Sequence, residues 1–420
     1  MVRPRIVIVG AGFGGLSAAH ALGGADADVT VIDRRNYHLF QPLLYQVATA
    51  GLSPAQIASP IRAILRRAAN VRVVLGKVSG VNRERRVVRL DDRSEGREIP
   101  YDQLVLATGS RHAYFGHDEW ESVAPGLKKI DDATSIRRRI LTAFEQAEAS
   151  DSAEARRRLL SFVVIGAGPT GVEMAGSIAE LAHVALRHDF RTIDPRDARI
   201  VLVEAGARVL PAFPPALSDA AHKALERLHV EVRLGTPVTH CDDGGVTIGS
   251  EYVPAETIVW AAGVAASAAG HWLGVEKDRI GRVPVGPDLT VPGHPEIFVI
   301  GDTASVAGVD GQPLPGLAPV AKQQGAYVAR VLRARLAGKP APPPFRYRDF
   351  GTMATIGRRS AVADFGWLRL DGTLAWLMWG LVHVSFLIGF RNRAIVMLDW
   401  IWSYVTFQSG ARLITGSEPD

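Results

Sequence analysis

Two glycine-rich runs of the kind that bind dinucleotides stand in this 420-residue chain, each directly after a short apolar run. The glycines are Gly10, Gly12 and Gly15 in the first run and Gly166, Gly168 and Gly171 in the second. Only glycine lets the backbone turn sharply from a strand into a helix and approach a pyrophosphate closely. One such match is weak, but both have a strand-like segment before them and a helix-like segment after them. The pair predicts two dinucleotides and, most simply, a flavoprotein that passes electrons between them.

An acidic residue follows the second predicted strand of each unit. Asp33 follows residues 29–32 directly. Its distance from the first glycines is close to the roughly 20-residue spacing at which a carboxylate binds a ribose. Glu204 ends residues 200–203 but lies much farther from its glycines, which predicts a long helix from Val172 to about His188 and a polar loop between. A carboxylate repels a 2′-phosphate, so Glu204 favours NADH over NADPH; Arg208 lies close enough to leave NADPH open.

The elements that must position these residues recur along the chain. Residues 104–109 read as a strand that ends in a small-residue turn with Thr108 and Gly109, and residues 257–263 repeat this pattern up to Gly263. A third strand, residues 296–302, delivers Asp302 toward a flavin ribityl or phosphate region.

The repetition predicts an α/β fold of two Rossmann-like domains, the second inserted in the first. The expected boundaries are 1–155 and 285–345 for the first domain, 156–284 for the second and 346–420 for a C-terminal region.

Composition limits the chemistry. The chain is 47% hydrophobic and 22% charged, as globular proteins are, and its first strand begins so early that no signal peptide is expected. Cys241 is the only cysteine, which excludes an internal disulfide, a CxxC redox centre and a cysteine-based metal cluster; no metal site is predicted. The net charge is +5, but the arginines are dispersed and not interleaved with aromatics, so nucleic acid is not an expected partner.

The tail is apolar and aromatic. Residues 374–390 carry only His383 as an ionisable group and would span roughly 26 Å as a helix, less than the ~30 Å hydrocarbon core. A stripe recurs at three- and four-residue steps: Trp376, Trp379, His383, Phe386, Leu387 and Phe390. Residues 394–407 form a second such segment, which carries Asp399. Two helices lying in the membrane interface fit this pattern better than a transmembrane hairpin. Packing of the stripe on the core or on a dimer partner is the alternative.

Three segments resemble a known family more specifically than the glycines do. They are residues 37–45 (YHLFQPLLY), Ala321–Gly325 (AKQQG) and residues 387–393 (LIGFRNR). With the paired glycine runs, they resemble the type II NADH dehydrogenases, single-subunit NADH:quinone oxidoreductases that pump no protons, within the two-dinucleotide-binding-domain flavoproteins.

The resemblance implies FAD in the first unit, NADH in the second, and hydride transfer to the flavin followed by two-electron reduction of a membrane quinone, ubiquinone or menaquinone. The implied FAD residues are Gly10, Gly12, Gly15, Asp33, Thr108, Gly109, Asp302 and Ala321. The implied NADH residues are Gly166, Gly168, Gly171, Glu204 and Gly263.

Catalytic roles follow from the same resemblance. Glu173 is expected either to position the nicotinamide or to relay a proton toward the quinone. The alternative is a purely structural role, in which Glu173 is a first-turn residue stabilised by the helix dipole. Gln323 and Gln324 match a quinone-site segment, although Pro319 stands where some members carry glutamine. The expected location is the cytoplasmic face of the membrane, as a peripheral protein on an anionic surface, and a homodimer is compatible with it. A soluble NAD(P)H-dependent reductase for a protein acceptor is the alternative function, and a flavin-bound interaction protein the third.

Overall fold

The computed structural model describes residues 3–91, 96–308, 311–406 and 411–415. Phe407, the last residue of the second predicted interfacial helix, lies outside these ranges, as do the outermost residues of the predicted domains, Met1 and Asp420. The chain forms two compact units that alternate along the sequence. The first unit comprises Met1–Leu39, Ala58–Arg111 and Val264–Asp349; the second comprises Phe40–Ile57, His112–Gly263 and Phe350–Asp420. The units divide the chain differently from the predicted boundaries: residues 112–155, expected in the first domain, belong to the second unit, and residues 264–284, expected in the second domain, belong to the first.

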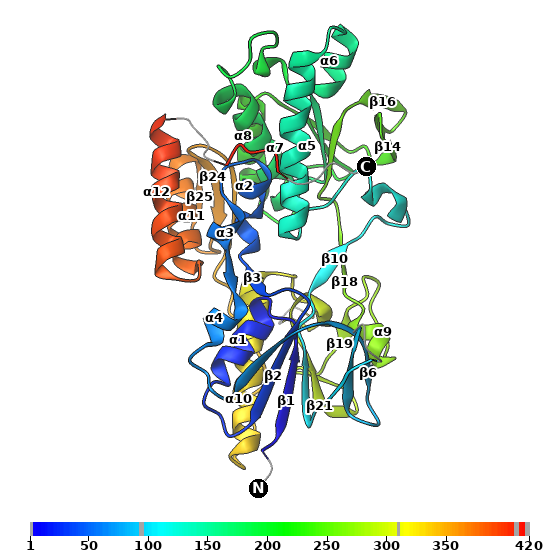
Figure 1. Ribbon diagram of the computed structural model, residues 1–420, viewed down its shortest axis with the longest axis vertical. Coiled ribbons are helices and arrows are strands. Elements are labelled where there is room, and N and C mark those ends of the chain that lie inside the picture. The colour runs from blue at the N-terminus through cyan, green and yellow to red at the C-terminus, as the bar shows by residue number, and fades with distance from the viewer. Residues whose placement is uncertain (1–2, 92–95, 309–310, 407–410, 416–420) are drawn as a thin grey trace. The chain divides into compact units, whose positions relative to one another are not determined.

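The first unit contains a six-stranded sheet in the order β20-β21-β9-β1-β2-β5. Its centre is β1 (Arg5–Val9), which pairs in parallel with β2 (Asp28–Asp33) on one side and β9 (Gln103–Leu106) on the other. Residues 6–9 are all buried, as expected for β-branched strands covered on both faces. The chain leaves β1 for α1 (Phe13–Ala21), which lies beside α10 (Ala318–Leu336) (Figure 1). The first glycine loop therefore lies where the strand order reverses, the usual ligand position in such sheets.

The remaining elements of the first unit are the other three strands of this sheet and the short strands and helices around it. They are β3 (Tyr37–Leu39), β4 (Ala58–Pro60), α4 (Ile61–Leu65), β5 (Val71–Leu75), β6 (Lys77–Asn82), β7 (Val87–Asp91), β8 (Glu98–Pro100), β18 (Val264–Ala266), α9 (Ala269–Leu273), β19 (Val283–Pro284), β20 (Thr290–Val291), β21 (His294–Val299), η5 (Gly301–Thr303) and β22 (Ala304–Ser305). The chain passes from this unit to the other within β10 (Ser110–His112).

The second unit repeats the plan with four parallel strands in the order β13-β12-β11-β17. Here β11 (Ser161–Ile165) is the strand before the glycines, and it lies between β12 (Arg199–Glu204) and β17 (Thr257–Trp260). The helix after the glycines, α7 (Pro169–Glu180), is shorter than predicted and continues into a π-helical turn, η3 (Leu181–Ala185).

The fourth strand of this sheet, several helices and a small antiparallel sheet also belong to the second unit. They are η1 (Gln41–Leu43), α2 (Leu44–Ala48), α3 (Pro54–Ile57), η2 (Asp118–Glu121), α5 (Ile130–Ala149), α6 (Ala153–Leu159), η4 (Pro195–Asp197), α8 (Pro215–Arg227), β13 (Val230–Leu234), β14 (Val238–Asp242), β15 (Gly245–Ile248) and β16 (Glu251–Pro254).

The last part of the second unit is a three-stranded antiparallel sheet followed by two helices. The strands are β23 (Thr352–Gly357), β24 (Ser360–Asp364) and β25 (Arg369–Asp371), and the helices are α11 (Gly372–Phe386) and α12 (Phe390–Thr406). Strand β23 lies against α7, and a Cβ added to Gly176 would lie 1.7 Å from the carbonyl oxygen of Ile356. Glycine at position 176 is therefore what allows this close approach. Gly389, with φ +88°, makes the turn between the two helices.

Candidate active site

The first glycine loop has glycine at both positions where a side chain would collide with the protein. Gly10 has φ +99°, and a Cβ there would lie 2.3 Å from the carbonyl oxygen of Ala107. A Cβ on Gly15 would lie 1.8 Å from the carbonyl oxygen of Gly10. Gly12 is different, because no protein atom lies within 4 Å of a Cβ there. Its open side, at the N-terminus of α1, leaves room for a pyrophosphate against the backbone.

The second loop has the same geometry. Gly166 has φ +99°, and its added Cβ would lie 2.5 Å from the Cα of Ala262. A Cβ on Gly171 would lie 1.7 Å from the carbonyl oxygen of Gly166, whereas one on Gly168 would meet no protein atom within 4 Å. Two glycines of each predicted set therefore shape the loop, and the third is open to a ligand.

The two predicted ribose-binding carboxylates hold these loops in place. Asp33 Oδ2 accepts a hydrogen bond of 2.7 Å from the backbone N–H of Ala11, and Glu204 Oε2 accepts one of 2.8 Å from Ala167. The other oxygen of Glu204 accepts from the N–H of Gly206 at 2.8 Å. A carboxylate can accept about four hydrogen bonds, so both side chains keep capacity for a ribose hydroxyl. A ribose contact stays a prediction for both.

A buried histidine that sequence reasoning did not single out also supports the first loop. His38 Nδ1 lies 2.9 Å from the carbonyl oxygen of Ala11, and its ring packs edge-on against Phe13 at 5.1 Å between centroids. Burial lowers the pKa of His38, so the ring is neutral near pH 7 and donates one hydrogen bond to that carbonyl. In the sequence, only its position within the YHLFQPLLY segment pointed to a role for His38.

The turns after β9 and β21 meet in a cluster of hydroxyl groups in the first unit. Thr108 Oγ1 lies 2.5 Å from Ser267 Oγ, and Thr303 Oγ1 donates to the carbonyl oxygen of Gly109 at 3.1 Å. Asp302 Oδ2 accepts a hydrogen bond of 2.6 Å from Ser110 Oγ. The structure thus brings Thr108, Gly109 and Asp302 together, as the prediction of one cofactor site requires.

The predicted quinone-site glutamines lie on α10, and both bind the backbone. The buried Gln324 accepts a hydrogen bond of 2.6 Å from the N–H of Gly301. Gln323 makes two bonds to Arg348: its Nε2 donates to the carbonyl oxygen at 2.9 Å, and its Oε1 accepts from the N–H at 3.0 Å.

The two neighbours of these glutamines in the segment pack against the first glycine loop. A Cβ on Gly325 would lie 2.1 Å from the carbonyl oxygen of Gly14. A Cβ on Gly14 would in turn lie 3.1 Å from the carbonyl oxygen of the buried Ala321. The AKQQG segment therefore fits α10 tightly to the loop. These packing contacts favour a positioning role for the segment.

Glu173 lies on α7 of the second unit, five residues after Gly168. It lines a small cavity together with Gln41, Pro42, Leu44, Tyr45, Leu127, Lys128 and Thr170. Burial raises the pKa of Glu173 to about 8, and a hydrogen bond with the backbone of Thr355 partly offsets this. The carboxyl group is therefore protonated near neutral pH and close to its titration point, as a proton carrier should be.

Gly263 and Glu173 belong to the second unit, whereas Gln323 and Gln324 belong to the first. Gly263 lies after β17, where a Cβ would lie 2.4 Å from the ring of Phe115. Among the described residues, no group of His, Cys, Asp and Glu side chains could hold a metal ion.

The stripe predicted for the tail is turned only partly inward: Trp379 and Leu387 are buried, whereas Phe386 is 53% exposed and Phe390 87% exposed. Trp379 is 3% exposed and Leu387 1% exposed. The rings of His383 and Trp400 each stack on the ring of Trp379, which therefore packs toward α12. Further apolar residues of α11 and α12 are exposed as well. This apolar tail face consists of Leu374, Leu377, Leu381, Met397, Leu398, Ile401, Trp402 and Val405. Within the described part of the chain, no helix is both long and apolar enough to cross a bilayer.

Comparisons with known proteins agree with this geometry. The family described as pyridine nucleotide-disulphide oxidoreductase matches residues 4–325, and the NDH2 C-terminal domain matches residues 350–406. The type II NADH:quinone oxidoreductase Ndh of Mycobacterium tuberculosis is 46% identical over 99% of this chain and 91% of its own. A similarly named protein of Staphylococcus haemolyticus is 30% identical over 86% of this chain and 89% of its own.

Solved structures share the fold at lower identity. The structure of NDH2 from Plasmodium falciparum in complex with NADH has a TM-score of 0.90 at 21% identity, covering 99% of this chain and 100% of that one. A sulfide:quinone oxidoreductase from Aquifex aeolicus has a TM-score of 0.71 at 18% identity, with 96% of this chain and 95% of that chain covered.

Proposed function

This chain belongs to the type II NADH:quinone oxidoreductases, and from that membership we infer which of its residues carry the reaction. The enzyme uses a flavin to move electrons from NADH to a quinone. The bound flavin would supply the two-electron chemistry that couples oxidation of NADH to reduction of the quinone. The observation that carries the assignment of sites is the repeated loop, with matching glycines, φ values and carboxylate contacts in both units.

The flavin is FAD, bound by the first unit, because a glycine loop of this shape accommodates a pyrophosphate and only the dinucleotide form of flavin has one. Gly12 gives the phosphates room, and Asp33 accepts hydrogen bonds from the ribose. Thr108, Gly109, Asp302 and Ala321 form the floor of the site. Acid release of the flavin and chromatography test this assignment, which FMN in the released fraction would overturn.

NADH binds the second unit, against Gly166, Gly168 and Gly171. Glu204 accepts hydrogen bonds from the adenosine ribose and repels the 2′-phosphate of NADPH. Glu173 holds a proton near this loop. With its pKa at about 8, it can give up that proton near neutral pH when the quinone takes up two.

Gln323 and Gln324 act on the quinone side of the reaction, and their contacts favour positioning over direct binding. Gln323 fixes the segment at Arg348, and Gln324 fixes the turn before Asp302. Substitution of Gln323 by Leu is then expected to raise KM for the quinone more than KM for NADH.

The enzyme binds the membrane surface through the apolar tail face, with Arg391 and Arg393 near anionic headgroups. We place it on the cytoplasmic side, where NADH is available, and a homodimer that leaves this face open is compatible with the proposal.

The first experiment is an anaerobic cycle with the purified flavoprotein. NADH should bleach the visible flavin absorbance, and a short-chain quinone added afterwards should restore it. Bleaching without recovery would point to a protein acceptor, and no bleaching would contradict the enzyme role.

A further inference from the structure

Tyr45 is a buried phenol that lines the same cavity as Glu173, and the proposed function gives it no role. Among the residues that the structure describes, its hydroxyl oxygen has one hydrogen-bond partner: Gln46 Nε2 donates to it at 2.9 Å. The amide oxygen of Gln46 in turn accepts a hydrogen bond of 2.8 Å from Trp400 Nε1, on α12. A chain of two hydrogen bonds thus runs from the tail helix to the cavity.

The direction of this chain follows from chemistry. An indole N–H can only donate, so the amide oxygen of Gln46 must face Trp400. The NH₂ group of Gln46 must then face Tyr45, which makes the phenol oxygen an acceptor in that bond. The phenol's single hydrogen is therefore left to donate to a third group, and the cavity is where Tyr45 meets space for a ligand.

The phenol is also held in its protonated form. Burial raises the pKa of Tyr45 well above its usual value, and the nearby Glu173 adds to the rise whenever it is charged. Tyr45 is therefore a donor of a hydrogen bond throughout the range in which the enzyme works, and not a source of protons.

The cavity and its connections favour a quinone as the acceptor of that bond. Pro42, Leu44 and Leu127 supply an apolar lining for a ring, and a quinone carbonyl is a hydrogen-bond acceptor. The chain of bonds ends on α12, which also carries part of the apolar tail face. The side of the cavity that Tyr45 occupies is thus linked to the helix that a quinone dissolved in lipid would reach first.

We propose that Tyr45 donates a hydrogen bond to a carbonyl oxygen of the quinone, and that Gln46 and Trp400 are positioning residues that aim its hydroxyl. This proposal rests on the NADH:quinone activity and adds a specific contact to it. It also makes the seating of α12 a condition for quinone reduction, because Trp400 sets the orientation of the Gln46 amide.

The test separates the two half-reactions of the holoenzyme by stopped flow. NADH bleaching and reoxidation by a short-chain ubiquinone are measured for the wild type and for Tyr45→Phe, Gln46→Glu and Trp400→Phe. Gln46→Glu is the sharpest variant, because a carboxylate accepts from both neighbours and would draw the phenol hydrogen away from the cavity. Trp367→Phe, on an exposed loop of the same unit, is the matched control.

We expect Tyr45→Phe and Gln46→Glu to slow reoxidation roughly tenfold, the effect of one lost hydrogen bond, with NADH bleaching within twofold of wild type. Trp400→Phe should slow reoxidation less, and adding it to Tyr45→Phe should have no further effect. Three results would each overturn the proposal. They are reoxidation of Tyr45→Phe at the wild-type rate, a loss of rate in NADH bleaching and not in reoxidation, and additive effects of Tyr45→Phe and Trp400→Phe on reoxidation. Absence of quinone reoxidation in the wild type would instead refute the proposed function.

Discussion

Single residues determine the chemistry of this enzyme through burial and close packing. Glu173 has no cationic partner among the causes that shift its pKa, so burial dominates and the neutral form is favoured. Gly12 and Gly168 leave open space where Gly15 and Gly171 leave none. Residues of one type and one motif therefore have different roles, and substitutions can separate them.

The pKa of Glu173 predicts how stability depends on pH. The folded protein keeps this proton up to about pH 8, whereas the unfolded chain loses it near the ordinary value of 4.5. The folded state thus binds more protons between these values, and the contribution of Glu173 to stability falls as pH rises from 5 to 8. Glu173→Gln should remove this slope. The Tm of the variant relative to that of the wild type should therefore rise from pH 5 to pH 8. Parallel curves of Tm against pH would contradict the shifted pKa.

The glycines within each loop predict opposite outcomes for the same substitution. Gly12→Ala should fold normally and lose flavin, because its new Cβ meets no protein atom but occupies the side left open to a ligand. Gly15→Ala should fail to fold, since its Cβ would lie 1.8 Å from a backbone oxygen. Flavin content and Tm distinguish the two. In the second loop, Gly168→Ala should keep its flavin and raise KM for NADH at least tenfold; an unchanged KM would remove Gly168 from the NADH site.

The choice of nicotinamide cofactor is predicted to depend on Glu204. Glu204→Arg should shift the ratio of kcat/KM values toward NADPH by at least tenfold, because a guanidinium attracts the phosphate that a carboxylate repels. It also removes the two bonds to Ala167 and Gly206, so total activity should fall. Glu204→Gln is the control, because it removes the negative charge while keeping nearly the same side-chain shape. A ratio unchanged in both variants would exclude Glu204 from the ribose site.

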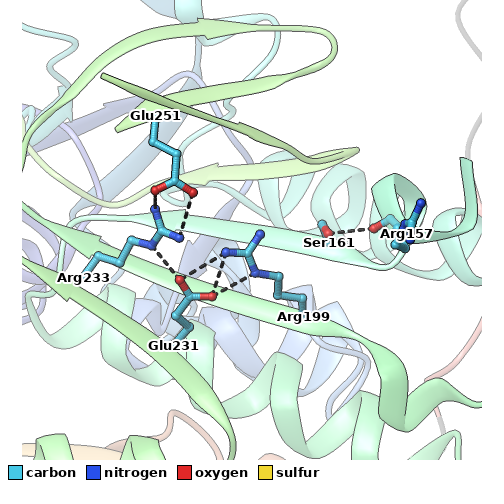
Figure 2. A network of polar contacts seen from close by, with 6 residues as sticks. All are labelled: Arg157, Ser161, Arg199, Glu231, Arg233 and Glu251. Atoms are coloured by element: carbon cyan, nitrogen blue, oxygen red, sulfur yellow. Dashed lines mark hydrogen bonds and ion pairs between the residues drawn. The ribbon is translucent and has the colours of Figure 1, made fainter. Parts of the chain in front are cut away.

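At the scale of elements, an ion network joins the parallel sheet of the second unit to the small antiparallel sheet of β14, β15 and β16 (Figure 2). Glu231 on β13 lies between two arginines: Arg199 on β12 at 2.8 Å and Arg233 at 2.6 Å. Arg233 also pairs with Glu251 on β16, at 2.8 Å. Three strands that are separate in sequence are thus connected through half-exposed charges.

Glu231→Gln should therefore reduce the free energy of unfolding by up to about 1 kcal/mol, because it leaves Arg199 and Arg233 close together without the charge between them. High salt should shrink the difference, since these side chains are partly exposed to solvent. Urea denaturation with and without added salt measures both effects. Asp194→Asn breaks an exposed pair with Arg196 outside this network and keeps a side-chain oxygen for the N–H of Arg196, so it should change little. Equal effects of the two substitutions would argue against a network.

At the scale of the whole molecule, the C-terminal region has two functions that must be tested separately. Strand β23 packs on α7 and its Thr355 contacts Glu173, so truncation after Pro344 would damage the fold as well as membrane binding. Charged substitutions on the apolar tail face avoid this problem. Leu381 is 74% exposed and Trp402 62% exposed, so replacing them should leave the core intact.

Leu381→Glu combined with Trp402→Glu should reduce binding to anionic phosphatidylglycerol vesicles at least tenfold. Each apolar side chain buried in the interface contributes ~1.5–3 kcal/mol, and added carboxylates are repelled by anionic lipid. Sedimentation with vesicles measures the bound fraction. Leu75→Glu, an exposed position in the other unit, is the matched control. A doubly substituted protein that still sediments while folded would rule out this face.

The sequence alone determined both dinucleotide loops, because their glycines are required by local geometry: the backbone must reverse within a few residues and meet a neighbouring strand. It also indicated Asp33 and Glu204, which follow strands directly, and the interrupted apolar tail. The end of α7 at Glu180, followed by a π-helical turn, was not predictable from helical periodicity, which continues through this region.

Only the tertiary structure decided contacts between segments that are far apart in the chain. The aromatic stripe looked membrane-facing because periodicity reveals that a helix has two faces, but not which face is buried. Packing against Trp400 buries Trp379, whereas Phe386 and Phe390 of the same stripe stay exposed. The hydrogen bond between Gln46 and Trp400 links positions more than 350 residues apart. Local sequence fixes backbone conformation, whereas burial and the direction of a hydrogen bond depend on which distant side chain folding brings alongside.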